Sequence, residues 1–131
     1  MAFHKFLKAV HENQHIPVFG DGTQTRDFTY IDDVIESISR LIKKGPPAGT
    51  IPYKIYNVGN HKPEELMQVV SLLEQELGRK AIKEMLPMQP GDVPATYADV
   101  ADLMRDVGFR PDTPIADGIR NFVAWYRQHY D

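Results

Sequence analysis

Apolar residues recur every three or four positions in five stretches of the chain, a spacing that turns one face of a helix toward a core. Asp32 and Asp33 precede the second stretch and are placed to cap it. Pro17 forces the first stretch to end before it, and Gly78 and Gly108 suit the left-handed caps that close helices. We therefore predict helices over residues 3–13 and 34–44, from Pro63 to Leu77, from Asp99 to Val107, and from Thr113 and Pro114 onward.

Short runs of β-forming residues lie between these helices. IPVFG (16–20) and RDFTYI (26–31) flank Asp21–Gly22, a dipeptide that tolerates the positive φ of tight hairpins, so we expect the two runs to pair. YKIYNVG (53–59) is the strongest strand pattern, and KAIKEMLP (80–87) predicts a further short strand. Helices that alternate with short strands indicate the α/β class.

Composition narrows the class of protein. The chain has 131 residues, 42% of them hydrophobic and 25% charged, as in a globular protein of one domain. A net charge of −3 gives no electrostatic case for binding nucleic acid or an anionic membrane. The sequence has no cysteine, which excludes disulfides and thiolate metal sites and favours an intracellular, cytoplasmic setting. No stretch approaches the length of a membrane span.

The segment HENQH (11–15) fits the H-E-x-x-H pattern, in which two histidines on one helical face hold zinc. A zinc hydrolase needs both histidines on a continuous helix, together with a third ligand. Here Pro17 lies two residues beyond His15, and the later His61 and His129 form no ligand pattern. We therefore interpret His11 and His15 as a polar helix end and expect no metal site.

Arg26 follows the turn and could present its guanidinium fork to a phosphate or carboxylate. The alternative is a structural salt bridge to Asp32 or Asp33, which the residues alone favour. Gln89 and Asp92 in the QPGDV loop offer hydrogen bonds suited to sugar or ribose hydroxyls. The alternative there is a turn in which Asp92 bonds its own backbone.

Three longer segments point to a family: VFGDGTQTRDFTYIDDVIESISRLI, YNVGNHKPEELMQVVSLLEQELG and LPMQPGDVPATYADVADLMRDVGFRPDTPIADGIRNFVAWYRQHY. Together they resemble the C-terminal, substrate-binding part of NAD-dependent epimerase/dehydratases, the extended short-chain dehydrogenase/reductases that act on sugar nucleotides. Within that group the chain most resembles UDP-glucuronate 4-epimerases. The resemblance implies a single C-terminal substrate-binding domain over residues 1–131, without the Rossmann nucleotide-binding half.

The resemblance also implies a role for each candidate residue. Main-chain atoms of Pro17 and Phe19 would contact the uracil, and Arg26 would hold the diphosphate. Gln89 would lie on the phosphate side, and Asp92 would bind the ribose. Many relatives carry arginine at the position of Gln89, so Arg26 is left as the evident positive charge for the diphosphate. Since the family positions coincide with the candidates chosen from the residues alone, we favour a binding role for Arg26.

Two motifs of the whole enzyme are missing from this sequence. It has neither the G-x-x-G-x-x-G turn that would hold NAD nor a Tyr-x-x-x-Lys pair that would move the proton. We therefore expect a fragment that binds no cofactor itself, binds a UDP-sugar weakly and does not epimerise it alone. The alternative is a ligand-free structural or interaction module that complements a separate N-terminal NAD-binding chain.

In relatives, the KIYNVG strand and the DDVIESISRLI helix pack against the nucleotide-binding domain. Exposed strand edges and apolar helix faces favour association. We therefore expect the chain to form a homo-oligomer.

Overall fold

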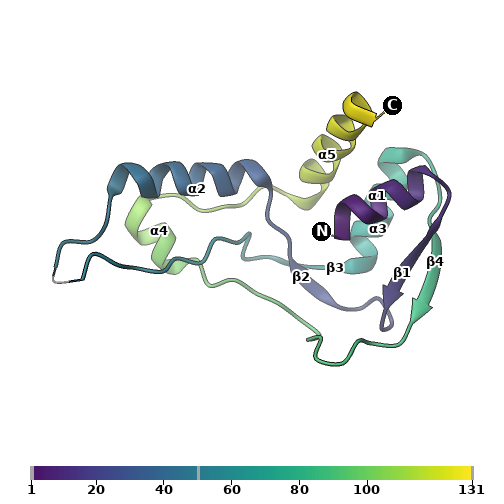
Figure 1. Ribbon diagram of the computed structural model, residues 1–131, viewed down its shortest axis with the longest axis horizontal. Helices are drawn as coiled ribbons and strands as arrows, with labels where there is room; N and C mark the ends of the chain where they lie inside the picture. The colour runs from purple at the N-terminus through teal and green to yellow at the C-terminus, as the bar shows by residue number, and fades with distance from the viewer. Residues whose placement is uncertain (1, 50, 131) are drawn as a thin grey trace. The chain divides into compact units, whose positions relative to one another are not determined.

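The computed structural model describes residues 2–49 and 51–130, which form helices and short strands of the predicted α/β class (Figure 1). Two compact units are present: residues 2–26, 64–96 and 114–130 form the first, and residues 27–49, 51–63 and 97–113 form the second. The elements are α1 (Ala2–His11), β1 (His15–Phe19), β2 (Thr25–Asp27), α2 (Ile31–Lys44), β3 (Pro63–Glu65), α3 (Leu66–Leu77), β4 (Ile82–Leu86), α4 (Ala101–Val107) and α5 (Ile115–Tyr130).

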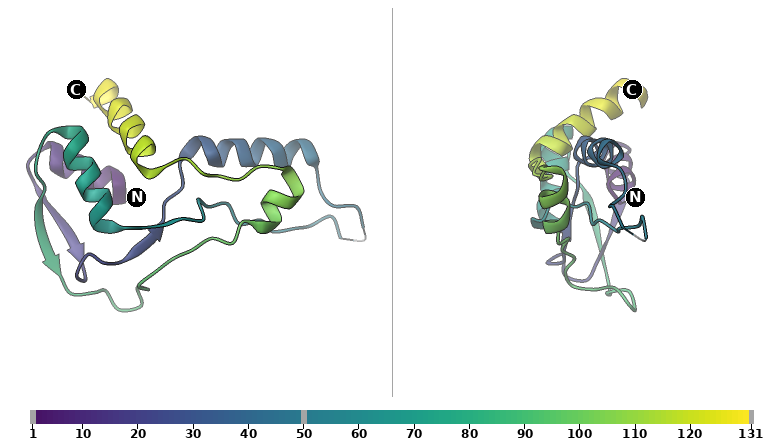
Figure 2. Two further views of the ribbon diagram at one scale, coloured as in Figure 1. Left: turned by 180° about the vertical axis from the view of Figure 1, so that it is seen from behind. Right: turned by 90° about the vertical axis from the view of Figure 1, so that its left-hand side faces the viewer.

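The first unit contains a parallel pair of strands, β1 and β4, and three helices, α1, α3 and α5 (Figure 2). β1 pairs with β4 from His15 opposite Ile82 to Phe19 opposite Leu86. β1 alternates in burial, so that Ile16 and Val18 are fully buried while His15 and Pro17 are exposed. The hydrophobic core consists of Phe6, Leu7, Val10, Ile16, Val18, Val69, Val70, Leu73, Leu77, Ile119, Val123 and Tyr126.

A buried carboxylate joins α3 to β4 in the first unit. The side chain of Glu74 is only 6% exposed. Its Oε1 accepts hydrogen bonds from Nζ of Lys83 at 2.8 Å and from the main-chain N–H of Ala81 at 3.0 Å. Its Oε2 accepts one from Nζ of Lys80 at 2.9 Å. These bonds lower the pKa of Glu74 from 4.5 to about 2, and the bond from Lys83 makes the largest contribution.

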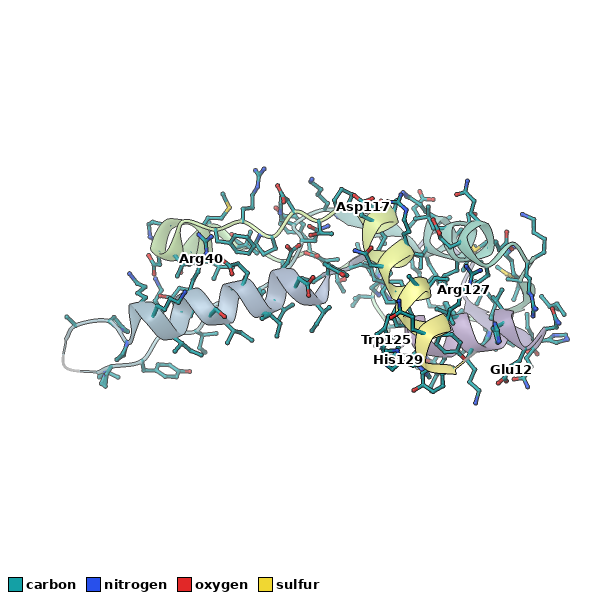
Figure 3. All side chains as sticks on the ribbon, turned by 90° about the horizontal axis from the view of Figure 1, so that it is seen from above. Glu12, Arg40, Asp117, Trp125, Arg127 and His129 are labelled. Atoms are coloured by element: carbon teal, nitrogen blue, oxygen red, sulfur yellow. The ribbon has the colours of Figure 1, made fainter. Side chains whose placement is uncertain are left out.

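α5 is tied to α3 at its C-terminal end. Arg127 of α5, labelled in Figure 3, donates a hydrogen bond of 2.9 Å to the main-chain oxygen of Glu76 in α3. Glu76 lies in the last turn of α3, where main-chain oxygens have no partner within the helix. Arg127 therefore satisfies a carbonyl that the helix itself leaves open.

The second unit contains α2 and α4, which pack side by side. Arg40 of α2, labelled in Figure 3, donates to the main-chain oxygens of Val107 and Gly108 at 3.3 and 3.1 Å, where α4 ends. Its guanidinium also lies over the ring of Phe109, 4.9 Å from the centroid. A cation at a helix C-terminus is favoured by the helix dipole, so Arg40 both caps α4 and fixes it to α2.

The predicted caps of α2 were wrong. Tyr30 stands at the N-cap without a side-chain cap bond. Asp33 is buried, and its Oδ2 accepts the main-chain N–H of Thr113 at 3.0 Å. The carboxylate of Asp33 therefore accepts a distant N–H instead of capping its own helix. This bond links α2 to the segment before α5.

The predicted hairpin was also wrong. IPVF lies in β1, whose partner is β4 in parallel. Of the returning run only Arg26 and Asp27 lie in a strand, β2, which pairs with β3. Pro63, predicted to open a helix, lies in β3, and α3 begins at Leu66, whose N–H donates to the oxygen of Gln24 at 2.9 Å. Long-range pairing overrode the turn signal because strand partners are chosen by the whole fold.

YKIYNVG is extended but is not a strand, so this prediction was wrong in its hydrogen bonding. Exposure alternates along it: Tyr53 and Ile55 are exposed, whereas Lys54 and Tyr56 are partly covered. Nζ of Lys54 and the hydroxyl of Tyr56 bond Oδ2 of Asp106 at 2.6 and 2.7 Å. Side-chain bonds to Asp106 therefore fix this segment, while no other described segment supplies a strand ladder for it.

Among residues 2–49 and 51–130, no helix has both the length and the apolar character needed to cross a membrane.

Candidate functional site

The candidate site begins where residues 92–96 run alongside β2. The N–H of Thr25 donates to the oxygen of Pro94 at 3.0 Å, and the N–H of Thr96 donates to the oxygen of Thr25 at 3.1 Å. These two bonds define a parallel bridge between Thr25 and Ala95. Because Arg26 follows Thr25 in the strand, this pairing brings the QPGDV loop next to its side chain.

The guanidinium of Arg26 is held at four points. Nη1 donates to the main-chain oxygen of Thr25 at 2.9 Å and to that of Pro94 at 3.4 Å. Nη2 donates to Oε1 of Gln24 at 3.2 Å and to Oδ1 of Asp92 at 2.6 Å. The alternative of a salt bridge to Asp32 or Asp33 is therefore corrected: the carboxylate that pairs with Arg26 is Asp92, which was predicted from the sequence to belong to the same site.

Gln24 connects this pair to β1. The residue is only 7% exposed, and its Nε2 donates to the main-chain oxygen of Phe19 at 3.2 Å. Phe19, Gln24, Arg26 and Asp92 thus form one continuous chain of hydrogen bonds. Gln24 was not among the residues predicted from the sequence, although its position two residues before Arg26 in an extended segment places both side chains on one face.

The QPGDV loop forms a turn as well as a partner for Arg26. Gly91 has φ of +84°, and the N–H of Asp92 donates to the oxygen of Gln89 at 3.1 Å. Oδ1 of Asp92 also accepts the N–H of Val93 at 2.9 Å. The interpretation of Asp92 as a residue that bonds its own turn is therefore confirmed, and the same oxygen also accepts a hydrogen bond from Arg26.

The structure does not join the remaining candidates to this network. Gln89 is exposed, and only its main-chain oxygen takes part in the turn. Pro17 is exposed on β1, opposite Glu84 of β4. The site that the structure brings together therefore consists of Arg26, Asp92 and the main chain at Phe19.

The site is open to a ligand. The side chains of Arg26 and Asp92 are 23% and 33% exposed, so solvent reaches both. An arginine fork on a rigid strand suits the oxygens of a phosphate, and a carboxylate beside it suits hydroxyl donors. The arrangement can bind an anion joined to a polyol.

His11 and His15 are separated by a change of element. His11 is the last residue of α1, and His15 is the first residue of β1. Within the described parts of the chain, no three histidine, aspartate or glutamate side chains gather as a metal would require. The two histidines therefore do not share the helical face that the H-E-x-x-H mechanism needs.

Asp27, which follows Arg26, organises the second unit. Its carboxylate accepts the N–H groups of Asn60, His61 and Ala98 at 2.7, 3.1 and 3.0 Å. The chain approaches so closely here that a Cβ added to Gly59 would lie 2.3 Å from Cβ of Ala98. Asp27 was missed from the sequence because its partners come from segments more than 30 residues away.

Comparison with known proteins finds proteins that are similar to this chain both in sequence and in fold. A model of the NAD dependent epimerase/dehydratase family matches residues 1–59. Protein CapI of Staphylococcus aureus is 46% identical over 143 residues, which cover 99% of this chain and 43% of CapI. A probable UDP-glucuronate 4-epimerase of Rhizobium meliloti is 41% identical over 144 residues, which cover 99% of this chain and 42% of that protein.

A solved structure of a similar protein has the same fold as this chain. The UDP-glucuronic acid 4-epimerase of Bacillus cereus, in complex with UDP-glucuronic acid and NAD, superposes with a TM-score of 0.86 at 32% identity. The match covers 99% of this chain and 40% of the epimerase. The chain therefore spans about two fifths of the length of these relatives.

In sequence and in fold, the chain is similar to proteins of the NAD-dependent epimerase/dehydratase family, which confirms the resemblance predicted from its motifs. Within this family, it is similar to the UDP-glucuronate 4-epimerases.

Proposed function

We propose that the chain is the UDP-sugar-binding part of a nucleotide-sugar epimerase of the UDP-glucuronate 4-epimerase type. Arg26 holds the diphosphate, and Asp92 accepts hydrogen bonds from the ribose. The main chain at Pro17 and Phe19 contacts the uracil, and Gln89 lies on the phosphate side.

The observation that carries this proposal is the chain of hydrogen bonds from Phe19 through Gln24 and Arg26 to Asp92. Three of the five residues proposed to contact the ligand, Phe19, Arg26 and Asp92, belong to this chain of hydrogen bonds. An arginine near a main-chain carbonyl and a carboxylate supports a ligand that carries a base, a ribose and a diphosphate.

We further propose that the chemistry requires residues supplied from elsewhere. This sequence has no glycine-rich strand–turn–helix for NAD and no Tyr-x-x-x-Lys pair. A substrate-binding domain over residues 1–131 would then work with an N-terminal NAD-binding partner in the cytoplasm. Alone it would bind a UDP-sugar weakly, because a ligand pocket normally buries most of its ligand between two walls.

Calorimetric titration with UDP tests the binding role. We expect saturable binding by the wild-type chain and its loss in Arg26→Ala, because the diphosphate loses its cation. Arg110→Ala is the matched control, since Arg110 is half exposed and pairs with Asp112 in the second unit. Absence of heat with millimolar UDP, or equal binding by Arg26→Ala, would contradict the proposal.

The exposed face of α2 favours a second candidate function, an interaction module. Four isoleucines of this helix are 45–74% exposed: Ile31, Ile35, Ile38 and Ile42. Their spacing of four, three and four residues places them on one side of the helix. Such an apolar stripe favours association, either with an N-terminal partner or with a second copy of the chain.

A further inference from the structure

We propose that Asp92 is a specificity-determining residue, which makes the Arg26 site select nucleoside diphosphates over free inorganic phosphate and diphosphate. This inference rests on the proposed function, since it concerns the same site. It goes further by assigning Asp92 a second role, that of a competitor for the arginine when no nucleotide is bound.

All four terminal N–H groups of Arg26 already donate hydrogen bonds. Each of its two terminal nitrogens carries two hydrogens, and each makes two hydrogen bonds. An incoming phosphate that binds both terminal nitrogens must therefore displace one of the present partners. The ion pair at 2.6 Å to Asp92 is the shortest of the four contacts.

Asp92 is the partner that can leave. The oxygens of Thr25 and Pro94 belong to the pairing of β2 with residues 94–96. Gln24 is 7% exposed and is also bonded to Phe19. Asp92 instead lies in a surface turn after Gly91, with its side chain 33% exposed. A rotation of that side chain, which also breaks its bond to the N–H of Val93, frees the arginine.

The free-energy cost of displacing Asp92 from Arg26 depends on the ligand that takes its place. When a free anion takes Arg26, the Asp92 carboxylate loses its cation and faces a like charge. A nucleoside diphosphate brings ribose hydroxyls, which donate hydrogen bonds to the displaced carboxylate. Since an unpaired charged acceptor is costly, the site favours the ligand that carries both groups.

Asp92→Asn tests the inference, because asparagine keeps the shape and removes the charge. We expect affinity for inorganic diphosphate to rise about tenfold, since a charged competitor of Arg26 is lost. Affinity for UDP should rise less or fall, because the ribose loses its charged acceptor. The ratio of UDP to diphosphate affinity should therefore fall, by about tenfold if the affinity for UDP is unchanged and by more if it falls.

Two controls make the result specific. Asp112→Asn removes the same charge from an exposed aspartate that pairs with Arg110, and should leave both affinities unchanged. The double variant Arg26→Ala/Asp92→Asn should lose the gain in diphosphate binding. Thermal denaturation of each variant verifies that it is folded at the temperature of titration.

The outcomes separate this inference from the proposed function. If the wild-type chain binds UDP but Asp92→Asn gains no affinity for diphosphate, the selective role of Asp92 is overturned and the binding function stands. A gain that persists in the double variant also overturns it, because Arg26 is then not the group released. Failure of the wild-type chain to bind UDP overturns both.

Discussion

At the scale of single residues, carboxylates fix both units through bonds to groups outside their own helix or strand. Asp27 accepts three N–H groups, Asp33 accepts that of Thr113, and Glu74 accepts bonds from two lysines and Ala81. The roles of these residues were missed or misjudged because nothing in the local sequence names a partner. Arg26 and Asp92 were predicted as a site because family motifs carry such long-range information.

Glu74 gives the first prediction at this scale. Its pKa falls from the ordinary 4.5 to about 2 in the folded chain, so the folded state binds the proton more weakly than the unfolded state. The stabilisation is therefore complete above pH about 4.5 and is lost as the pH falls toward 2. Glu74→Gln should lower the free energy of unfolding by roughly 2 kcal/mol at pH 7, since Lys80 is exposed and screened.

Urea denaturation at pH 7, 5 and 3 measures this effect. The difference between wild type and Glu74→Gln should shrink as the pH falls. Glu76→Gln, two residues along α3 at a more exposed position, is the matched control and should change stability little. A difference that stays constant between pH 7 and 3 would disprove the linkage.

At the scale of elements, the helices could be predicted and the strand partners could not. The five helices follow from apolar periodicity, which is local, although α1 ends at His11 and α3 begins at Leu66. Strand pairing depends on residues far apart, so β1 pairs with β4 and not with the run after the turn. YKIYNVG shows the alternation of a strand but is held by Asp106.

The segment from Tyr53 to Val58 gives a prediction for this scale. The hydrogen bond to Asp106 is the largest cause that raises the pKa of Tyr56, and Lys54 is bound to the same oxygen. Asp106→Asn should therefore lower the pKa of Tyr56.

Spectrophotometric titration of the tyrosines detects that shift, and Tyr56→Phe identifies which transition belongs to Tyr56. Asp102→Asn is a suitable control, because Asp102 is only the smallest cause that raises this pKa. We expect a smaller shift from that variant. An unchanged tyrosine titration in Asp106→Asn would show that the segment is held by other contacts.

At the scale of the whole molecule, the apolar face of α2 predicts association. Light scattering should report a mass above that of one chain, which is 14.9 kDa. Ile35→Glu with Ile38→Glu should lower that mass, because two charges then lie in the exposed stripe. Ser39→Glu adds charge without removing an isoleucine and should lower it less.

A monomeric mass for the wild-type chain at working concentration would count against homo-oligomers. An unchanged mass in the double isoleucine variant would place the interface away from α2. Either result leaves the proposed nucleotide site unaffected, because Arg26 and Asp92 belong to the first unit and α2 to the second.

The central claim is that Arg26 binds the diphosphate of a nucleotide, and calorimetry with UDP and uridine on the same preparations tests it most directly. If Arg26 contacts the diphosphate, the wild-type chain should bind UDP more tightly than uridine, and Arg26→Ala should lose that preference while any uridine binding persists. Equal affinities of the wild-type chain for UDP and uridine, or a preference that survives in Arg26→Ala, would contradict the account.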